Sequence, residues 1–144
     1  MAQLSNVTVG ATPRRADKTI TFDNTAGNGA VGTVALFTTT GAVLVKSIGV
    51  SCTADLTGAL ATISLGVVGN VGGLITVTTA TTIDSGQIWA DGTPTANLKA
   101  LPAALKDILI NSNMQYDILT AGITGGVLKI SVVWEPASGN GNLV

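Results

Sequence analysis

Three glycines near the N-terminus have the spacing of a dinucleotide-binding loop. Gly27, Gly29 and Gly32 fit the pattern G-x-G-x-x-G, a strand-like stretch at Lys18–Phe22 precedes them, and Asp55 follows where an acid would hold a ribose. Such a loop must open a helix whose N-terminus faces the pyrophosphate. The residues after Gly32 are rich in Val and Thr, which favours a strand instead. We therefore expect backbone turns at Gly27 and Gly29, a bulge or close backbone approach at Gly32, and no nucleotide.

Other side chains that could do chemistry are sparse. The chain has no histidine and one cysteine, Cys52, which we interpret as a buried thiol because no histidine can act as its base. The eight carboxylates mostly lie beside turns, where Asp bonds its own backbone. Sequence alone leaves open whether two carboxylates meet in space, or whether a loop at Asp84 and Asp91 holds calcium. The sequence predicts a protein that is not an enzyme and that has no cofactor and no zinc site.

Two groups of residues are candidates for contact with a partner. The first is the basic cluster Arg14, Arg15 and Lys18, which is either a solvated patch or an arm that meets carboxylates on a partner. The second is Trp89 with Asp91, at the start of a long connection, where an exposed ring could take a sugar. For Trp89 we favour packing in the core over such an exposed position.

The composition points to a surface that a partner covers. Of the 144 residues, 46% are hydrophobic and 10% are charged, against about 25% charged in a typical soluble domain. The net charge of −1 argues against a general nucleic-acid binder. The uncharged run Leu56–Ile83 is broken by glycines and threonines, so it predicts two buried strands joined by the turn "VGNVGG" rather than a membrane span. With 3% aromatic residues and no signal-peptide pattern, we expect no contact with a membrane.

Short runs of Val, Ile and Thr between Gly, Asn and Asp predict an all-β chain. In "VLKISVVW", Leu128, Ile130, Val132 and Trp134 should face the core, and "MQYDIL" should bend or bulge. "TTTG" and "AGITGG" are interpreted as hairpin turns, and the connection Asp91–Asp107 as holding a short helical turn at Leu98–Ala100 or Ala103–Leu105. Strands are expected at Lys18–Phe22, Val31–Phe37, Ala42–Cys52, Ala61–Val68, Gly73–Thr79, Gln87–Ala90, Ile108–Leu119 (either continuous or interrupted) and Val127–Trp134.

These elements predict one antiparallel domain, a jelly-roll-like β-sandwich or a β-barrel, with extended terminal arms. We expect an N-terminal arm at 1–17, the β domain at 18–135 and a C-terminal tail at 136–144. The tail has the composition of a segment that does not pack on its own domain.

Several segments together resemble a family of small tailed-bacteriophage proteins that are virion structural components. They are "GAVGTVALFTTTGAVLVKSIGVSCTADL", "ATISLGVVGN", "TTIDSGQIWADGTPTA" and "ALPAALKDILI", within about Thr21 to Glu135. The resemblance implies a protein made in the bacterial host cytoplasm and located in the virion. With the low charge it favours a capsid decoration, or cement, protein on the capsid surface. That protein would bind the major capsid protein, preferably as a homotrimer, and would bind no nucleic acid. The alternative is a head-fibre or tail-associated protein that binds host surface glycans through Trp89 and Asp91.

Overall fold

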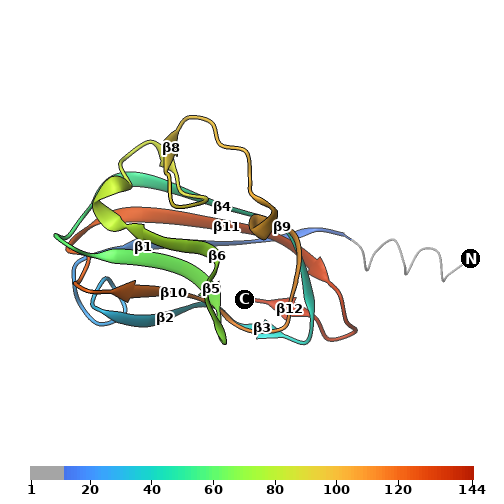
Figure 1. Cartoon of the computed structure of the whole chain (residues 1–144). Coiled ribbons are helices and arrows are strands. Elements are labelled where there is room, and N and C mark those ends of the chain that lie inside the picture. Colours follow the sequence, from blue (N-terminus) through green and yellow to red (C-terminus); the bar gives the residue numbers. More distant parts are fainter. Residues whose placement is uncertain (1–11) are drawn as a thin grey trace, which may run out of the picture.

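The computed structural model describes residues 12–144, and these residues form two antiparallel sheets packed face to face and one small two-stranded sheet (Figure 1). The predicted all-β sandwich is confirmed. Short 3₁₀ turns lie at Ala80–Thr82 (η1) and Ala103–Leu105 (η2), and the second confirms one of the two predicted helical turns. The strands are β1 (Arg14–Thr21), β2 (Gly32–Phe37), β3 (Thr39–Thr40), β4 (Val43–Thr57), β5 (Thr62–Val67), β6 (Asn70–Thr79), β7 (Gln87–Ile88), β8 (Thr95–Ala96), β9 (Lys106–Ile110), β10 (Met114–Leu119), β11 (Gly125–Pro136) and β12 (Asn142–Leu143).

The chain crosses repeatedly between the two sheets. The larger sheet has the order β1-β11-β4-β7-β8, with β9 also paired to β4, and the smaller sheet has the order β2-β10-β5-β6. Successive strands therefore alternate between sheets except at the β5–β6 hairpin and around β7–β9. This order is jelly-roll-like, with two open sheets rather than one closed barrel.

The core lies between the sheets and follows the predicted alternation. Leu128, Ile130, Val132 and Trp134 of β11 are all at most 3% exposed. Each fully buried aliphatic side chain contributes roughly 1.5–3 kcal/mol through its removal from water. The predicted irregularity in β10 is also confirmed, because the register with β2 shifts between Met114 and Gln115.

Two predicted hairpin turns are wrong. The segment 38–41 joins β2 to β4, and 121–126 joins β10 to β11, and in both cases the two strands belong to different sheets. In the first segment the Thr39 amide donates to Asn113 Oδ1 at 2.8 Å, and β3 pairs with β12 instead of forming a hairpin. Two apolar strands joined by a short turn can form a hairpin within one sheet or a crossover between two sheets. The local sequence pattern is the same in both cases, so it did not distinguish a hairpin from a crossover.

The predicted arms are shorter than expected. β1 begins at Arg14, which pairs with Trp134, so the β domain starts before residue 18, and the first eleven residues of the predicted arm lie outside the described part. The prediction that the tail does not pack on its own domain is wrong. β12 pairs with β3, and the Leu143 side chain is 2% exposed in the core. Backbone hydrogen bonds to β3 and Thr38, together with the burial of Leu143, hold the tail on the domain.

The edge strand beside β4 is split in two. Ser51 of β4 faces Ile88 of β7, and Ser47 of β4 faces Lys106 of β9. From Ser51 to Ser47 is four residues along β4, whereas from Ile88 to Lys106 is eighteen residues along the chain. The edge strand therefore contains an insertion of fourteen residues. The intervening segment 89–105, which we call the excursion, projects from the outer side of the larger sheet, at the top of Figure 1. Its strand β8 folds back to pair with β7.

Candidate functional site

The glycine loop is a structural turn that leads into a strand, as predicted. Gly27 and Gly29 have φ values of 81° and 117°, and β2 begins at Gly32. The Tyr116 hydroxyl donates to the Gly27 carbonyl at 2.9 Å and so ties the loop to the core. The close backbone approach occurs at Gly29, where a Cβ would clash with the Ile123 carbonyl oxygen. It does not occur at Gly32, where a Cβ would meet open space, so that part of the prediction is wrong.

The thiol of Cys52 is buried, as predicted. It contacts the Ala54 carbonyl oxygen at 3.0 Å and the Ile83 carbonyl oxygen at 3.6 Å. Burial raises the pKa of this thiol above its usual value. Both the contacts and the raised pKa favour the neutral form, which is a poor nucleophile.

Three carboxylates, those of Asp23, Asp55 and Asp91, accept backbone amides at turns. Asp55 Oδ1 accepts the Ser85 amide at 2.7 Å, and Asp91 Oδ1 accepts the Thr93 amide at 2.8 Å. Asp84, the second residue considered for calcium, begins a turn in which its amide donates to Gln87 Oε1. Within residues 12–144 there is no group of three or more His, Cys, Asp or Glu side chains that could hold a metal ion.

The structure separates the three predicted basic contact residues. Side chains alternate along β1, so Arg14 and Lys18 lie on one side of the strand and Arg15 on the other. The Arg14 guanidinium lies 5.4 Å from the centre of the Trp134 ring, and Lys18 Nζ donates to the Leu36 carbonyl at 2.8 Å. Arg15 Nε lies 2.9 Å from Asp17 Oδ1. Each cation thus has a partner within its own chain, and the three do not form one patch.

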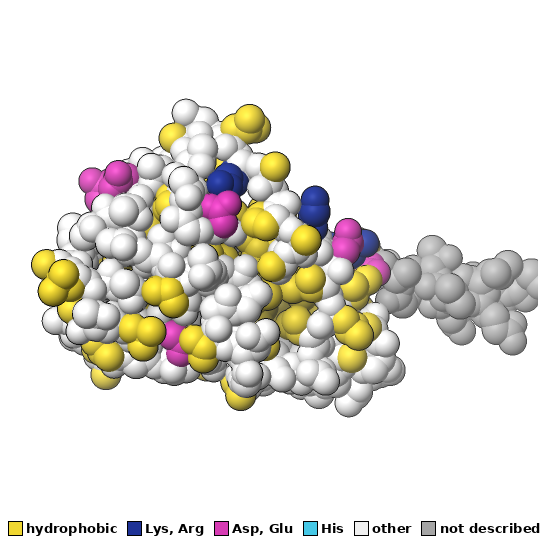
Figure 2. Space-filling model, in the orientation of Figure 1, with side chains coloured by type: hydrophobic (Ala, Val, Ile, Leu, Met, Phe, Trp, Pro, Cys, Tyr) yellow, Lys and Arg dark blue, Asp and Glu magenta, His cyan; other side chains and the backbone are white. Residues whose placement is uncertain are grey.

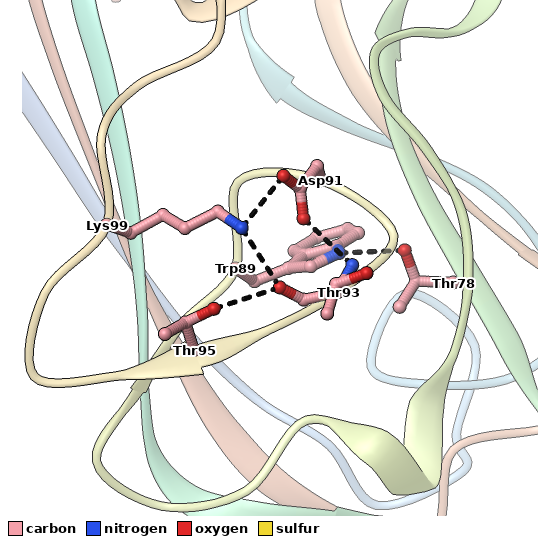
Figure 3. Close-up of polar contacts among 6 residues, drawn as sticks. All are labelled: Thr78, Trp89, Asp91, Thr93, Thr95 and Lys99. Carbon is pink, nitrogen blue, oxygen red and sulfur yellow. Dashed lines mark hydrogen bonds and ion pairs between the residues drawn. The ribbon is translucent and has the colours of Figure 1, made fainter.

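Trp89 anchors the excursion and does not present its ring to solvent (Figure 3). Its side chain is fully buried, and Nε1 donates to Thr78 Oγ1 at 2.9 Å. Packing in the core, the favoured interpretation of Trp89, is therefore confirmed, and the prediction that its ring contacts a partner is wrong. Asp91, the remaining candidate, pairs with Lys99 Nζ at 2.8 Å. That hydrogen bond, together with the Thr93 amide, holds the pKa of Asp91 below its usual value.

The outer face of the smaller sheet carries almost no charge. We call this surface, formed by the outward side chains of β2, β10, β5 and β6, the uncharged face. Within these four strands Asp117 is the one charged residue, and it is 4% exposed. It accepts hydrogen bonds from the Thr33 hydroxyl and from Gln115 Nε2, the latter at 3.3 Å. Ser64 faces it across the β5–β10 ladder and is fully buried, with no hydrogen-bond partner for Oγ among the described residues.

Exposed apolar side chains border the uncharged face. Val77 of β6 is 48% exposed and Leu119 of β10 is 44% exposed. Figure 2 shows mostly white and yellow atoms over the lower half of the molecule, where the smaller sheet lies, while most blue and magenta atoms lie above and to the right. Further exposed apolar side chains lie in β6 itself, at Val71, and in the adjoining turns, at Val31, Leu60 and Val68.

The uncharged face was not predicted from the sequence, because a run of residues without charge was interpreted as buried strands. The run Leu56–Ile83 was predicted to be two buried strands, but β6 is an edge strand whose residues are mostly exposed. Counting charges strand by strand would have found the feature, since the four strands of one sheet contain a single charged residue.

No helix within residues 12–144 is long and apolar enough to cross a membrane. Compared with known proteins, the chain matches no family model, no curated protein and no solved structure.

Proposed function

We propose that the protein is a structural component of a bacteriophage virion, a capsid decoration protein that attaches through its uncharged face. The observation that carries the proposal is the concentration of neutral and exposed apolar side chains on one sheet of a sandwich whose other sheet bears most of the charge. Contiguous uncharged surface of this kind is typical of protein interaction sites.

Docking through this face costs little desolvation. Charged residues are depleted in the cores of interfaces because a charge that leaves water must be paired or it opposes binding. Asp117 already lies out of water, with hydrogen bonds from Thr33 and Gln115 of its own chain. A partner that covers the face therefore removes apolar surface from water without stripping water from an exposed charge.

The proposed mechanism is binding without an active site. Copies of the protein, preferably as homotrimers, would cover contacts between major capsid protein subunits on the capsid surface. A ligand that binds the assembled state alone stabilises that state by mass action. Symmetry repeats each contact many times, so modest individual affinities suffice.

The test compares two lysine substitutions at exposed apolar strand positions. Val77→Lys lies on the uncharged face, and Leu109→Lys lies on β9 of the larger sheet, where the side chain is 67% exposed. We expect both variants to fold. We expect only Val77→Lys to lose binding to expanded capsids in co-sedimentation, because it places an unpaired cation in the interface. Capsids with the bound wild-type protein should also withstand heating better than bare capsids.

Two results would contradict the proposal. One is unimpaired capsid binding by a folded Val77→Lys variant, and the other is an equal loss with Leu109→Lys. A wild-type protein that does not sediment with capsids at all would reject the decoration function itself.

A further inference from the structure

A second surface, on the opposite side of the sandwich, is shaped as a groove of about 320 Å³. Its floor is the outer side of β4, where Gly49 and Ser51 carry little or no side chain. One wall is β11, with Lys129 and Ser131. The other wall is formed by Ile88 of β7 and by two residues of the excursion, Lys99 and Leu101. A Cβ at Gly49 would meet no atom within 4 Å, so the space above the floor is open.

The wall that the excursion forms is fixed in place. Lys99 Nζ bonds both Asp91 Oδ2 at 2.8 Å and the Thr93 carbonyl at 3.2 Å, and its side chain is 18% exposed (Figure 3). At the base of the loop, the Trp89 amide donates to the Val50 carbonyl at 2.9 Å. The groove is therefore formed before any ligand binds, which reduces the entropy lost on binding.

The charge in the groove is positive. Lys129 is exposed and has no ion-pair partner within residues 12–144. The nearest acid along the ladder, Asp17 of β1, is held by Arg15 and by the Ser131 hydroxyl. Lys99 is already paired with Asp91. One cation is thus left without a counter-charge beside a floor that offers the hydroxyl group of Ser51.

We propose that this groove binds an acidic polypeptide segment in an extended conformation. Lys129 takes a carboxylate of the segment, and Ile88 and Leu101 take an adjacent aliphatic side chain. The small side chains at Gly49 and Ser51 let an extended chain lie against β4. A sugar fits less well, since none of the residues that line the groove is aromatic and sugars favour aromatic platforms. The groove and the uncharged face lie on opposite sides of the sandwich, so both can be occupied at once.

The experiment uses the full chain and two synthetic peptides. One peptide alternates leucine with glutamate, and the other replaces each glutamate with glutamine. In ¹⁵N-resolved NMR titrations we expect the glutamate peptide to shift the amide signals of Gly49, Ser51, Leu101 and Lys129. We expect the glutamine peptide to bind about tenfold more weakly. We expect an acidic oligosaccharide such as oligogalacturonate to leave these signals unchanged.

Two matched leucine substitutions test the site. Gly49→Leu fills the groove without touching the core. Gly139→Leu adds the same side chain at another exposed position with no atom within 4 Å of its Cβ. We expect Gly49→Leu to abolish the titration and Gly139→Leu to preserve it. Lys129→Gln should weaken binding about tenfold, the equivalent of one hydrogen bond to a charged group.

Three outcomes would overturn the proposal. They are no shift with the glutamate peptide, equal shifts with the glutamine peptide or the oligosaccharide, and undiminished binding by a folded Gly49→Leu variant. None of these measurements involves capsids, so failure of the decoration proposal would leave this result standing, and the reverse is also true.

Discussion

The hydrogen bond between Trp89 and Thr78 offers a sharp test of how the excursion is anchored. The two side chains are 0% and 3% exposed, and the indole N–H donates to the hydroxyl across 2.9 Å. We consider Trp89→Phe, Thr78→Val and the double variant. The first removes the donor and shrinks the ring, and the second replaces the acceptor with a methyl group of similar size.

The expected losses of stability follow from burial. Trp89→Phe leaves a cavity of roughly 40 Å³, which at about 24 cal/mol per Å³ costs about 1 kcal/mol. Loss of the hydrogen bond adds about 1 kcal/mol. Thr78→Val leaves the indole N–H buried without an acceptor, at a cost of about 1–3 kcal/mol. In the double variant the orphaned N–H is gone, so the total should fall short of the sum of the two single losses by about 1 kcal/mol.

Urea unfolding of the four proteins measures this coupling. The free energies of unfolding are compared at unchanged m-values, which keeps the two-state treatment valid. If the two single losses simply add, to within about 0.3 kcal/mol, the hydrogen bond does not couple the excursion to β6 and the reasoning is refuted.

Two further predictions use the same measurement. Gly29→Ala should lose about 2–4 kcal/mol of stability, because φ at this position is positive and the new Cβ would clash with the Ile123 carbonyl oxygen. Gly49→Ala, the control, should change stability by less than about 0.5 kcal/mol, because a Cβ there meets open space. Equal losses in the two variants would contradict this account. The pKa of Asp91 is lowered in the folded state, so its stabilising effect is complete above about pH 5 and is lost as the pH falls through the lowered value. The stability difference between wild type and Asp91→Asn should accordingly shrink between pH 7 and pH 3, and a constant difference would exclude this role for the carboxylate.

The sequence predicted local features better than long-range ones. The alternation in β11 identified the buried row from Leu128 to Trp134, because the side-chain period of a strand is a local property. The strand that follows the glycine loop was also predicted, from its Val and Thr residues. Sheet membership is not local, and so the connections 38–41 and 121–126 were mistaken for hairpins.

The candidate surfaces were harder to predict for the same reason. Trp89 is buried because Thr78, eleven residues earlier, supplies an acceptor from the opposite sheet, and nothing near Trp89 in the sequence marks that partner. The three basic residues share a short stretch of sequence, but a strand turns alternate side chains to opposite faces. The groove combines residues from β4, β7, β11 and the excursion, which only the assembled sheet brings together.

Because the edge strand beside β4 is split, the excursion can be replaced by another loop without a change in the sandwich. Both of its ends rejoin the same partner, at Ser51 and at Ser47 of β4, so the loop between them can change in length without moving any other strand. Longer flexible loops cost little, about 0.6 kcal/mol for each doubling of length. Its fully buried residues lie at its roots, Trp89 and Ala90 at one end and Leu105 at the other. The sandwich can therefore serve as a scaffold on which different recognition loops are mounted over the same groove floor.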